Sequence, residues 1–287
     1  MSGRVAILSP DPESDGYRTR WRDVLEVNAA PLRAAGLEVE PRAWTAATDL
    51  AGFDLVLPLL VWGYPFAPRR WAEAVDRWEA SGVRLANAAP VLRWNADKTY
   101  LERLGARGAP AVPTLFVEKL DEAALVDAAA RFGTDRLVAK PQVSSTAWQT
   151  IRWSPGKSIE GGPEGPAMIQ PYLPEIEHSG EVSLIWFGRQ FSHGIVKRPQ
   201  PGDFRVQPEF DGIIGAYDPA ADEMDAAARV LEAVEEPLLY ARVDLVRGLS
   251  GAPELIELEL IEPDLYLGYE DNAGAGFAAA VKELIAA

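Results

Sequence analysis

Cysteine is absent from this chain of 287 residues. The chain therefore has no disulfide framework, no thiolate nucleophile and no zinc-finger chemistry. Long apolar runs are also missing. No segment approaches the roughly 18 apolar residues of a membrane span, and the N-terminal stretch SGRVAILSP has no signal-peptide core. We therefore expect a cytoplasmic protein with no membrane partner.

Basic side chains are few relative to acidic ones. There are 28 Lys and Arg against 43 Asp and Glu, which gives a formal net charge of -15. This balance argues against affinity for nucleic-acid backbones, which requires basic patches, but is compatible with a metal-bound nucleotide. With 48% hydrophobic and 25% charged residues, the chain is typical of a soluble globular protein with two or three sub-domains.

The first part of the chain alternates between short apolar strands and amphipathic helices. We expect strands at 4–8, 37–42, 53–60 and 83–86, and helices at 17–35 and 69–81. This order predicts an open parallel α/β unit, in which ligands bind beyond the carboxyl ends of the strands. The residues at those ends either contribute to substrate binding or form plain connecting loops; they are Ser9, Asp11, Asp15 and 62–64.

The middle of the chain contains two lysines in different settings. Lys98 stands near the start of a helix predicted over 95–107, where a solvated lysine is the ordinary interpretation. Lys140 interrupts the apolar strand predicted at 137–141. Burying an ammonium is costly unless it meets an anion, so a phosphate partner is favoured; the alternative is a lysine that protects an exposed sheet edge. Residues 143–153 could form a hairpin.

Two later segments have features of a nucleotide site. Residues 168–174, MIQPYLP, combine an apolar strand with a proline-framed linker, which fits an adenine slot or an inter-domain hinge. Strands at 180–187 and 190–197 flank a tight turn. The most basic stretch follows at 197–205, KRPQPGDFR, as either a loop over a polyphosphate or a surface loop.

An acidic hairpin is predicted at 240–267. The strands 241–246 and 254–261 flank turn residues, and alternation places Glu257 and Glu259 on one face with Asp244 opposite them. An all-oxygen cluster suits Mg²⁺ that holds nucleotide phosphates. The alternative is a hairpin whose polar face lies in water.

Taken in order, these motifs resemble those of the ATP-grasp ligases. They resemble the glutathione-synthetase-like branch, and most of all the group that forms D-cycloserine. The resemblance covers about 95–267, and before that only the α/β pattern agrees. The motifs that carry it are Asn95-x-x-Lys98, LVAKP at 137–141, IQPY at 169–172, GExSL at 180–184, KRP at 197–199 with GDFR at 202–205, ARVD at 241–244 and ELE at 257–259.

The resemblance implies an α/β fold with α+β elements. An N-terminal parallel α/β domain, 1–93, would precede a central ATP-grasp sub-domain, 94–170, that serves as the lid. A C-terminal sub-domain, 171–287, would carry the magnesium site, and the two sub-domains would clamp the nucleotide. The implied cofactors are ATP and one or two Mg²⁺ ions, for which Mn²⁺ could substitute.

The resemblance also implies roles for individual residues. The metal ligands would be Asp244, Glu257 and Glu259. The groups around the γ-phosphate and the acyl phosphate would be Lys197 and Arg205. The remaining nucleotide contacts would be Lys98, Lys140, Ser144 and Ser145 at the phosphates, Gln170, Tyr172 and Leu173 at the adenine, and Glu181 near the ribose.

The implied activity is ligation through an acyl phosphate. A small carboxylate, such as an amino acid or a peptide-like acid, would react with ATP, and an amine from a second or the same molecule would then form a C–N bond. Neither His178 nor His193 is required as a base. A homodimer is compatible with the sequence.

One departure from the family pattern supports an alternative function. The loop at 142–150, QVSSTAWQT, has no glycine, whereas such ligases usually carry a glycine-rich loop there. This departure favours a non-catalytic ATP-binding module of the same fold. A sugar-nucleotide glycosyltransferase is a third hypothesis, but it gives no use to Lys140 and Arg205.

Overall fold

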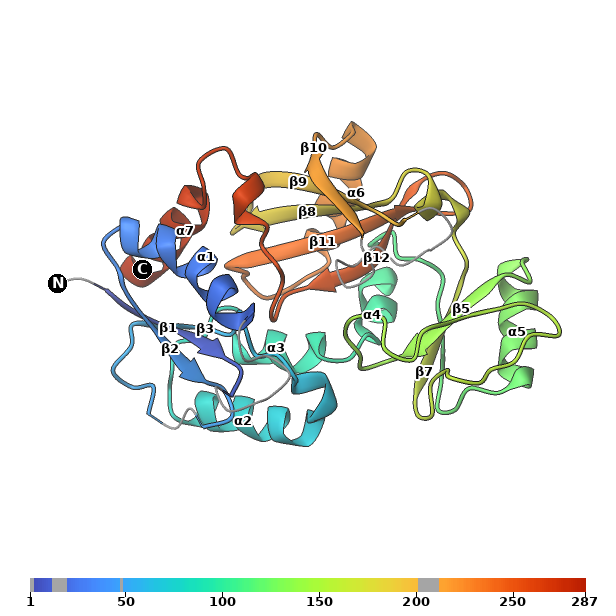
Figure 1. The fold of residues 1–287 in the computed structure, drawn as a ribbon, viewed down its shortest axis with the longest axis horizontal. Coiled ribbons are helices and arrows are strands. Elements are labelled where there is room, and N and C mark those ends of the chain that lie inside the picture. The colour runs from blue at the N-terminus through green and yellow to red at the C-terminus, as the bar shows by residue number, and fades with distance from the viewer. Residues whose placement is uncertain (1–2, 12–19, 47–48, 201–211) are drawn as a thin grey trace.

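The computed structural model describes residues 3–11, 20–46, 49–200 and 212–287. They form three β-sheets that follow one another along the chain, with the last sheet lying between the other two in space (Figure 1). The domain boundaries at 93 and 170 stay a prediction. Among the described residues, no helix combines the length and the apolarity needed to cross a bilayer.

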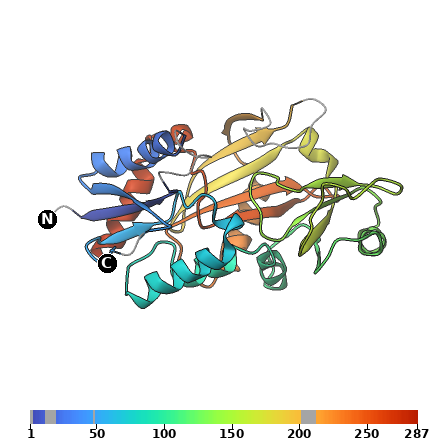
Figure 2. The same ribbon diagram turned by 60° about the horizontal axis from the view of Figure 1, so that its bottom comes forward.

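The first sheet is parallel, as its alternating sequence predicts. Strand β1 (Arg4–Ser9) lies between β2 (Glu38–Ala43) and β3 (Leu55–Leu57). The predicted strand at 83–86 is reduced to a single bridge between Val56 and Leu85. Because residues alternate across a strand, one face of β1 packs on α1 (Arg20–Ala34) and the other on α2 (Pro68–Ala80). Figure 2 shows these two helices on opposite sides of the sheet.

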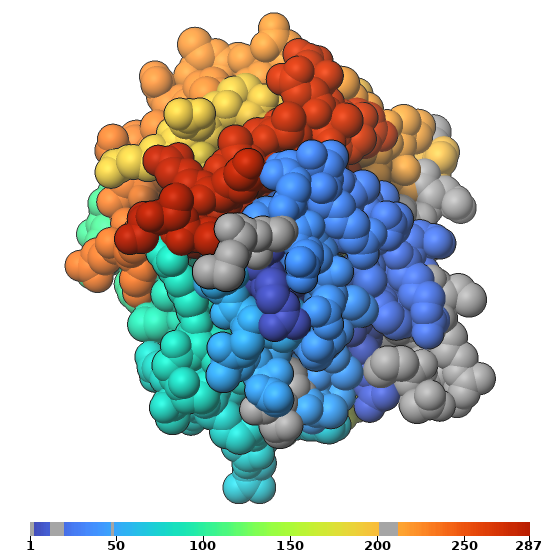
Figure 3. Space-filling model, turned by 90° about the vertical axis from the view of Figure 1, so that its left-hand side faces the viewer, coloured from blue at the N-terminus to red at the C-terminus, as the bar shows by residue number. Residues whose placement is uncertain are grey.

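The last helix of the chain returns to this first unit. Helix α7 (Ala275–Ala286) buries Phe277 and Val281 in the same apolar cluster as β1 and α1. The Lys282 ammonium donates to the carbonyl of Ala35 at 3.1 Å. Figure 3 shows the red C-terminal segment lying directly on the blue N-terminal one. The core of the first unit is therefore built from both ends of the described chain.

The middle unit begins with two short helices, α3 (Ala89–Asn95) and α4 (Tyr100–Ala106). The helix predicted over 95–107 is confirmed at its end, but its predicted start is wrong, since Lys98 lies between these two helices. Proline in the first turn of α3 starts that helix earlier than expected.

An antiparallel sheet follows in the order β4-β7-β5-β6. Its strands are β4 (Leu115–Val117), β5 (Leu137–Pro141), β6 (Ile151–Trp153) and β7 (Ala167–Pro171). Helix α5 (Glu122–Phe132) packs on this sheet. It starts where the Asp121 carboxylate accepts the Ala124 amide at 2.8 Å and ends at Gly133. Of the hairpin considered for 143–153, only β6 is a strand.

The last sheet is antiparallel in the order β10-β9-β8-β11-β12, and it contains both predicted hairpins. The strands are β8 (Glu181–Phe187), β9 (Gln190–Arg198), β10 (Ile213–Tyr217), β11 (Tyr240–Arg247) and β12 (Pro253–Glu259). The short turns η2 (Tyr64–Phe66), η3 (Pro174–Glu177) and η5 (Leu267–Tyr269) complete the fold. Helix α6 (Ala221–Glu232) covers the face to which Val243 and Leu245 point. Arg242 and Asp244 therefore point to the opposite face.

Asparagine side chains satisfy backbone groups along the outer edge of β12. The Asn95 amide donates to the carbonyl of Leu258 at 2.8 Å, and its oxygen accepts the Leu260 amide at 2.9 Å. Asn87 donates to the carbonyls of Tyr240 and Leu260, both at 2.9 Å. Such contacts cover an edge that would otherwise expose unpaired groups. They also fix α3 against the C-terminal sheet.

Replacing Asn95 by alanine is expected to destabilise the protein by about 2 to 4 kcal/mol, since it leaves two buried backbone groups without partners. Urea denaturation followed by circular dichroism measures the change. Asn272→Ala, at an exposed position, is the matched control and should leave the midpoint unchanged. Equal midpoints for both variants would contradict this role of Asn95.

Candidate functional site

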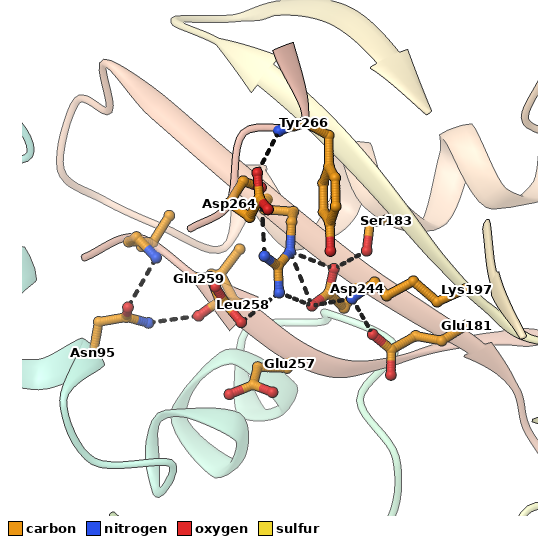
Figure 4. Close-up of polar contacts among 12 residues, drawn as sticks. Asn95, Glu181, Ser183, Lys197, Asp244, Glu257, Leu258, Glu259, Asp264 and Tyr266 are labelled. Atoms are coloured by element: carbon orange, nitrogen blue, oxygen red, sulfur yellow. Dashed lines mark hydrogen bonds and ion pairs between the residues drawn. The ribbon is translucent and has the colours of Figure 1, made fainter. Parts of the chain in front are cut away.

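Three carboxylates from the last hairpin meet at one point. Asp244 on β11 pairs directly with Glu257 on β12, and Glu259 lies two residues further along the same face. One oxygen from each of the three lies within 4.8 Å of the others. The predicted convergence of these side chains is confirmed, and Figure 4 shows it. The donor set consists only of carboxylate oxygens, which suits a hard divalent cation.

Asp244 is too buried for the solvated-hairpin alternative. Its side chain is 1% exposed. It accepts hydrogen bonds from Ser183 Oγ at 2.5 Å and from the Arg242 guanidinium at 2.8 Å. Burial alone would raise the pKa of Asp244, but Arg242 and Lys197 outweigh it and lower the pKa to about 2. The carboxylate is therefore ionised and able to bind a cation.

Arg242 is a site residue that sequence reasoning passed over. Its guanidinium lies between Asp244 and Glu259 and donates to both carboxylates. It also lies 5.7 Å from the ring centroid of Tyr266. The signal was present in the sequence, because an arginine two residues before an aspartate on a strand shares its face.

Lys98 and Lys140 approach the same acidic group from the middle unit. The Lys98 ammonium donates to the carbonyl of Ser144 at 2.7 Å and lies 3.2 Å from Glu257. Burial and the neighbouring Lys98 lower the pKa of Lys140, although Glu257 and Glu181 oppose this. Within the described part of the chain, the Lys140 ammonium makes no hydrogen bond or ion pair.

The position of Lys140 bears on the choice between its two interpretations. Strand β5 lies between β7 and β6, but β6 pairs only with residues 137–139 and leaves β5 unpaired on that side at Lys140. The Lys140 side chain lines the cavity, which favours the phosphate interpretation over a lysine that protects an exposed sheet edge. Lys140 is half-buried, and a partly desolvated cation without an ion-pair partner favours an anion in the cavity.

Lys197 and Glu181 form a close pair on β9 and β8. The Lys197 ammonium lies 2.5 Å from Glu181 and 3.5 Å from Asp244. Burial and Arg242 act to lower the pKa of Lys197, but Asp244 and Glu181 prevail and raise it. Lys197 is therefore a permanent cation beside the three carboxylates. Arg205, its predicted companion, lies outside the described residues.

The linker predicted to hold adenine lies along the same cavity. Gln170 on β7 is buried, and its amide donates to Thr114 Oγ1 at 2.9 Å. The Tyr172 amide donates to the carbonyl of Arg136 at 2.8 Å, so this N–H is already used. Tyr172 and Leu173 are buried and both line the cavity. Their adenine-binding role stays a prediction.

The glycine-free loop at 142–150 adopts a backbone that glycine would favour. Thr146, Ala147 and Gln149 have φ values of 50, 54 and 51°, in the left-handed region. Ser144 and Ser145 line the cavity, as does Thr146. The loop therefore reaches the site without glycine, at a cost in backbone strain.

A ring contact joins this loop to the N-terminal unit. The ring centroids of Trp148 and Phe66 are 5.5 Å apart, and the planes are inclined at 85°. Both side chains are otherwise exposed. Phe66 lines the cavity, as do Thr146 and Ala147 beside Trp148 in the loop, so the contact joins two parts of the cavity wall.

The carboxylates, the lysines and the adenine linker described above line one cavity of about 590 Å³. Its lining comes from the three units and includes Trp62, Gly63 and Tyr64 of the N-terminal loop. Of the other strand-end residues, Ser9 and Asp11 are not among the lining residues, and Asp15 lies outside the described part of the chain. The lining includes five basic side chains and six acidic ones: Arg20, Lys98, Lys140, Lys197 and Arg242, and Glu181, Asp244, Glu257, Glu259, Glu262 and Asp264.

Metal affinity should rise with pH near neutrality. Burial, with repulsion from Glu257 and Asp244, raises the pKa of Glu259 to about 7. A proton therefore competes with the metal below that pH. Mn²⁺ affinity of the nucleotide-free protein, measured by EPR, should increase about tenfold between about pH 6 and about pH 8. Glu259→Gln should remove most of this pH dependence, and an unchanged dependence would exclude Glu259 as a ligand.

Comparison with known proteins agrees with this geometry. Residues 5–87 match the family described as "D-cycloserine synthetase DcsG, N-terminal domain". The cycloserine biosynthesis protein DcsG of Streptomyces lavendulae is 29% identical over 273 residues, which cover 88% of this chain and 90% of that protein. The similarity to this group thus extends into the N-terminal unit, where the sequence motifs carried no resemblance.

Solved structures extend the comparison to the fold. The crystal structure of D-cycloserine synthetase DcsG matches with a TM-score of 0.81 at 28% identity, over 99% of this chain and 100% of that one. The D-alanine–D-alanine ligase of Bacillus anthracis matches with a TM-score of 0.71 at 15% identity, over 99% and 98%. The ATP-grasp ligase PsnB, complexed with Mg and ADP, matches with a TM-score of 0.67 at 18% identity, over 98% of each chain. The chain therefore has the ATP-grasp fold and is close, in sequence and in structure, to D-cycloserine synthetase DcsG.

Proposed function

We propose that this protein is an ATP-dependent carboxylate–amine ligase. The observation that carries the proposal is that Lys98 and Lys140 face the carboxylates of Asp244, Glu257 and Glu259 across a single cavity. Such an arrangement binds a polyphosphate on its cationic side and a divalent cation on its acidic side. The reaction would release ADP and phosphate and form a C–N bond.

The nucleotide would lie between the middle unit and the C-terminal sheet. Lys98 and Lys140 would contact its phosphates, since the Lys140 ammonium needs an anion. Ser144 and Ser145 would approach the phosphates from the strained loop. The adenine and the ribose would lie along the wall formed by Gln170, Tyr172, Leu173 and Glu181. The Tyr172 amide already donates to the carbonyl of Arg136, so it would not donate to the adenine.

The three carboxylates fit one or two Mg²⁺ ions, which Mn²⁺ could replace. Asp244 is ionised, and Lys98 and Lys140 overcome burial to lower the pKa of Glu257. Both therefore offer charged oxygens at neutral pH. The bound metal would neutralise charge on the phosphate oxygens. Arg242 would remain beside Asp244 and Glu259 as a second source of positive charge.

The chain's own residues would then position the substrates and stabilise charge. The substrate carboxylate attacks the γ-phosphorus of ATP, and ADP leaves as the acyl phosphate forms. Lys197 and Arg242 would stabilise the negative charge that develops there, together with Arg205, which lies outside the described residues. The amine then attacks the activated carbonyl and displaces phosphate.

Histidine is not needed in this scheme. His193 is buried, its Nδ1 lies 2.9 Å from Ser192 Oγ, and its Nε2 lies 3.1 Å from the carbonyl of Leu265. With both ring nitrogens engaged, His193 has a structural role. His178 is exposed on a 3₁₀ turn. Orientation and exclusion of water supply the catalysis instead.

The ligase hypothesis is favoured over a non-catalytic ATP-binding module. The glycine-free loop was the argument for such a module, yet it places Ser144 and Ser145 on the cavity without glycine. The charged set of Lys140, Asp244 and Glu257 is complete. The relatives named above are a synthetase and ligases, which match nearly the whole chain. No comparable observation favours a glycosyltransferase.

Glu257→Gln should abolish ADP release without unfolding the protein, because it removes one metal ligand and one partner of Lys98. Lys140→Met should weaken MgATP binding by about tenfold or more, since a desolvated charge pair is lost. ADP release is measured by a coupled assay against a panel of small amino acids. Lys157→Met, at an exposed position, is the matched control. Full ADP release by Glu257→Gln would refute the proposed site.

The contact between Phe66 and Trp148 should contribute to nucleotide retention. Phe66→Ala and Trp148→Ala should each weaken MgADP binding. The double variant should bind MgADP as tightly as either single variant, because each substitution alone already removes the ring contact. The coupling would be about 0.5–1.5 kcal/mol, the usual value for an aromatic pair. Isothermal titration calorimetry measures it, with Trp148→Phe as the conservative control. Strictly additive losses would show that the two rings act independently.

A further inference from the structure

Glu262 lines the cavity but has no part in the chemistry described above. It follows β12, three residues after Glu259. Its Oε2 atom is buried and has no hydrogen-bond donor in the described structure. A carboxylate oxygen that has lost water and gained no donor carries an uncompensated cost.

Among the described residues, no cation forms an ion pair with the Glu262 carboxylate. Three of the basic side chains that line the cavity are paired with other acids: Lys98 with Glu257, Lys197 with Glu181, and Arg242 with Asp244 and Glu259. Burial, and then repulsion from Glu259, raises the pKa of Glu262 well above its ordinary value. A cation brought by a ligand would favour the ionised form of Glu262 and pair with it.

The surrounding side chains favour an organic cation over a second metal site. The rings of Trp62, Tyr64 and Tyr266 line the same cavity. Burial raises the pKa of Tyr64, and Glu262 raises it more than any other charged group does, so the two side chains lie close together. Aromatic faces attract ammonium groups, whereas Mg²⁺ requires several oxygen ligands. The carboxylates close enough together for a metal do not include Glu262.

We propose that Glu262, with the rings of Trp62 and Tyr64, forms a subsite for the ammonium group of an amino-acid substrate. The inference rests on the proposed ligase function, since it names a group that one of the ligase's substrates carries. Glu262 is then a specificity-determining residue. It distinguishes an amino acid from an acid of the same size that lacks the positive charge.

Binding to the MgADP complex tests the subsite without requiring turnover. The probes are glycine, serine and alanine of both hands, each paired with its 2-hydroxy acid: glycolate, glycerate and lactate. Dissociation constants are measured by saturation-transfer NMR. In the wild-type protein, at least one amino acid should bind about tenfold or more tightly than its hydroxy acid, as expected for a charge-assisted contact. Glu262→Gln should reduce this ratio to about one, and Glu262→Asp should retain part of it.

Glu254 on β12 provides the matched control. Its Oε2 atom is also buried without a partner, but Glu254 does not line the cavity. Glu254→Gln should therefore keep the wild-type ratio. An unchanged ratio in Glu262→Gln, or no preference for the amino acids in the wild-type protein, would overturn the subsite. MgATP affinity, measured separately, should stay the same in Glu262→Gln.

The same measurements separate this inference from the ligase proposal. If the wild-type protein prefers amino acids but no substrate elicits ADP release, the ligase function fails and the subsite stands. If ADP is released equally with amino acids and hydroxy acids, the ligase function stands and the subsite fails.

Discussion

The buried carboxylate of Asp244 is the charge on which the geometry of the cavity depends. An ionised group that is 1% exposed persists only if its surroundings replace the lost water. Arg242, Lys197 and Ser183 do so from three different strands. Removing any one of them would leave charge or polarity unbalanced, so the network holds these strands in one arrangement. It also holds Glu181 and Glu259 on the cavity, through Lys197 and Arg242.

The cavity needs all three units, because each contributes groups that the others lack. The C-terminal sheet supplies most of the acids, the middle unit supplies Lys98 and Lys140, and the N-terminal loop supplies aromatic rings. Asn87 and Asn95 fix this assembly by bonding to the edge of β12. The left-handed residues of the loop at 142–150 each cost about 1 to 3 kcal/mol. The bond from Lys98 to Ser144 offsets part of that strain.

Sequence patterns predicted the local elements well where the periodicity was simple. The parallel unit, the β8–β9 and β11–β12 hairpins and the strand with Lys140 are confirmed, because alternation alone fixes which side chains share a face. The same rule predicted that Asp244, Glu257 and Glu259 converge. The break between α3 and α4 was missed, since Asn95 reads as a helix start although its side chain bonds to a strand far away in sequence. Such long-range partners leave no local signal.

Arg242 and Glu262 show that sequence patterns also fail to identify long-range partners within the site. Both stand in acidic or apolar runs, where a sequence shows charge but not its partner. Only the fold reveals that Arg242 forms ion pairs with two carboxylates, whereas Glu262 has no ion-pair partner among the described residues. Residues that contact a ligand instead of another residue are the ones that pairing rules fail to identify.

The position of α7 has a consequence for biosynthesis. Phe277 and Val281 complete the apolar cluster that contains Val5, Ile7 and Leu32. A ribosome releases the first unit long before these residues exist. The nascent first unit therefore exposes the apolar surface that α7 will cover, and it can reach its final packing only after residues 275–286 have been translated.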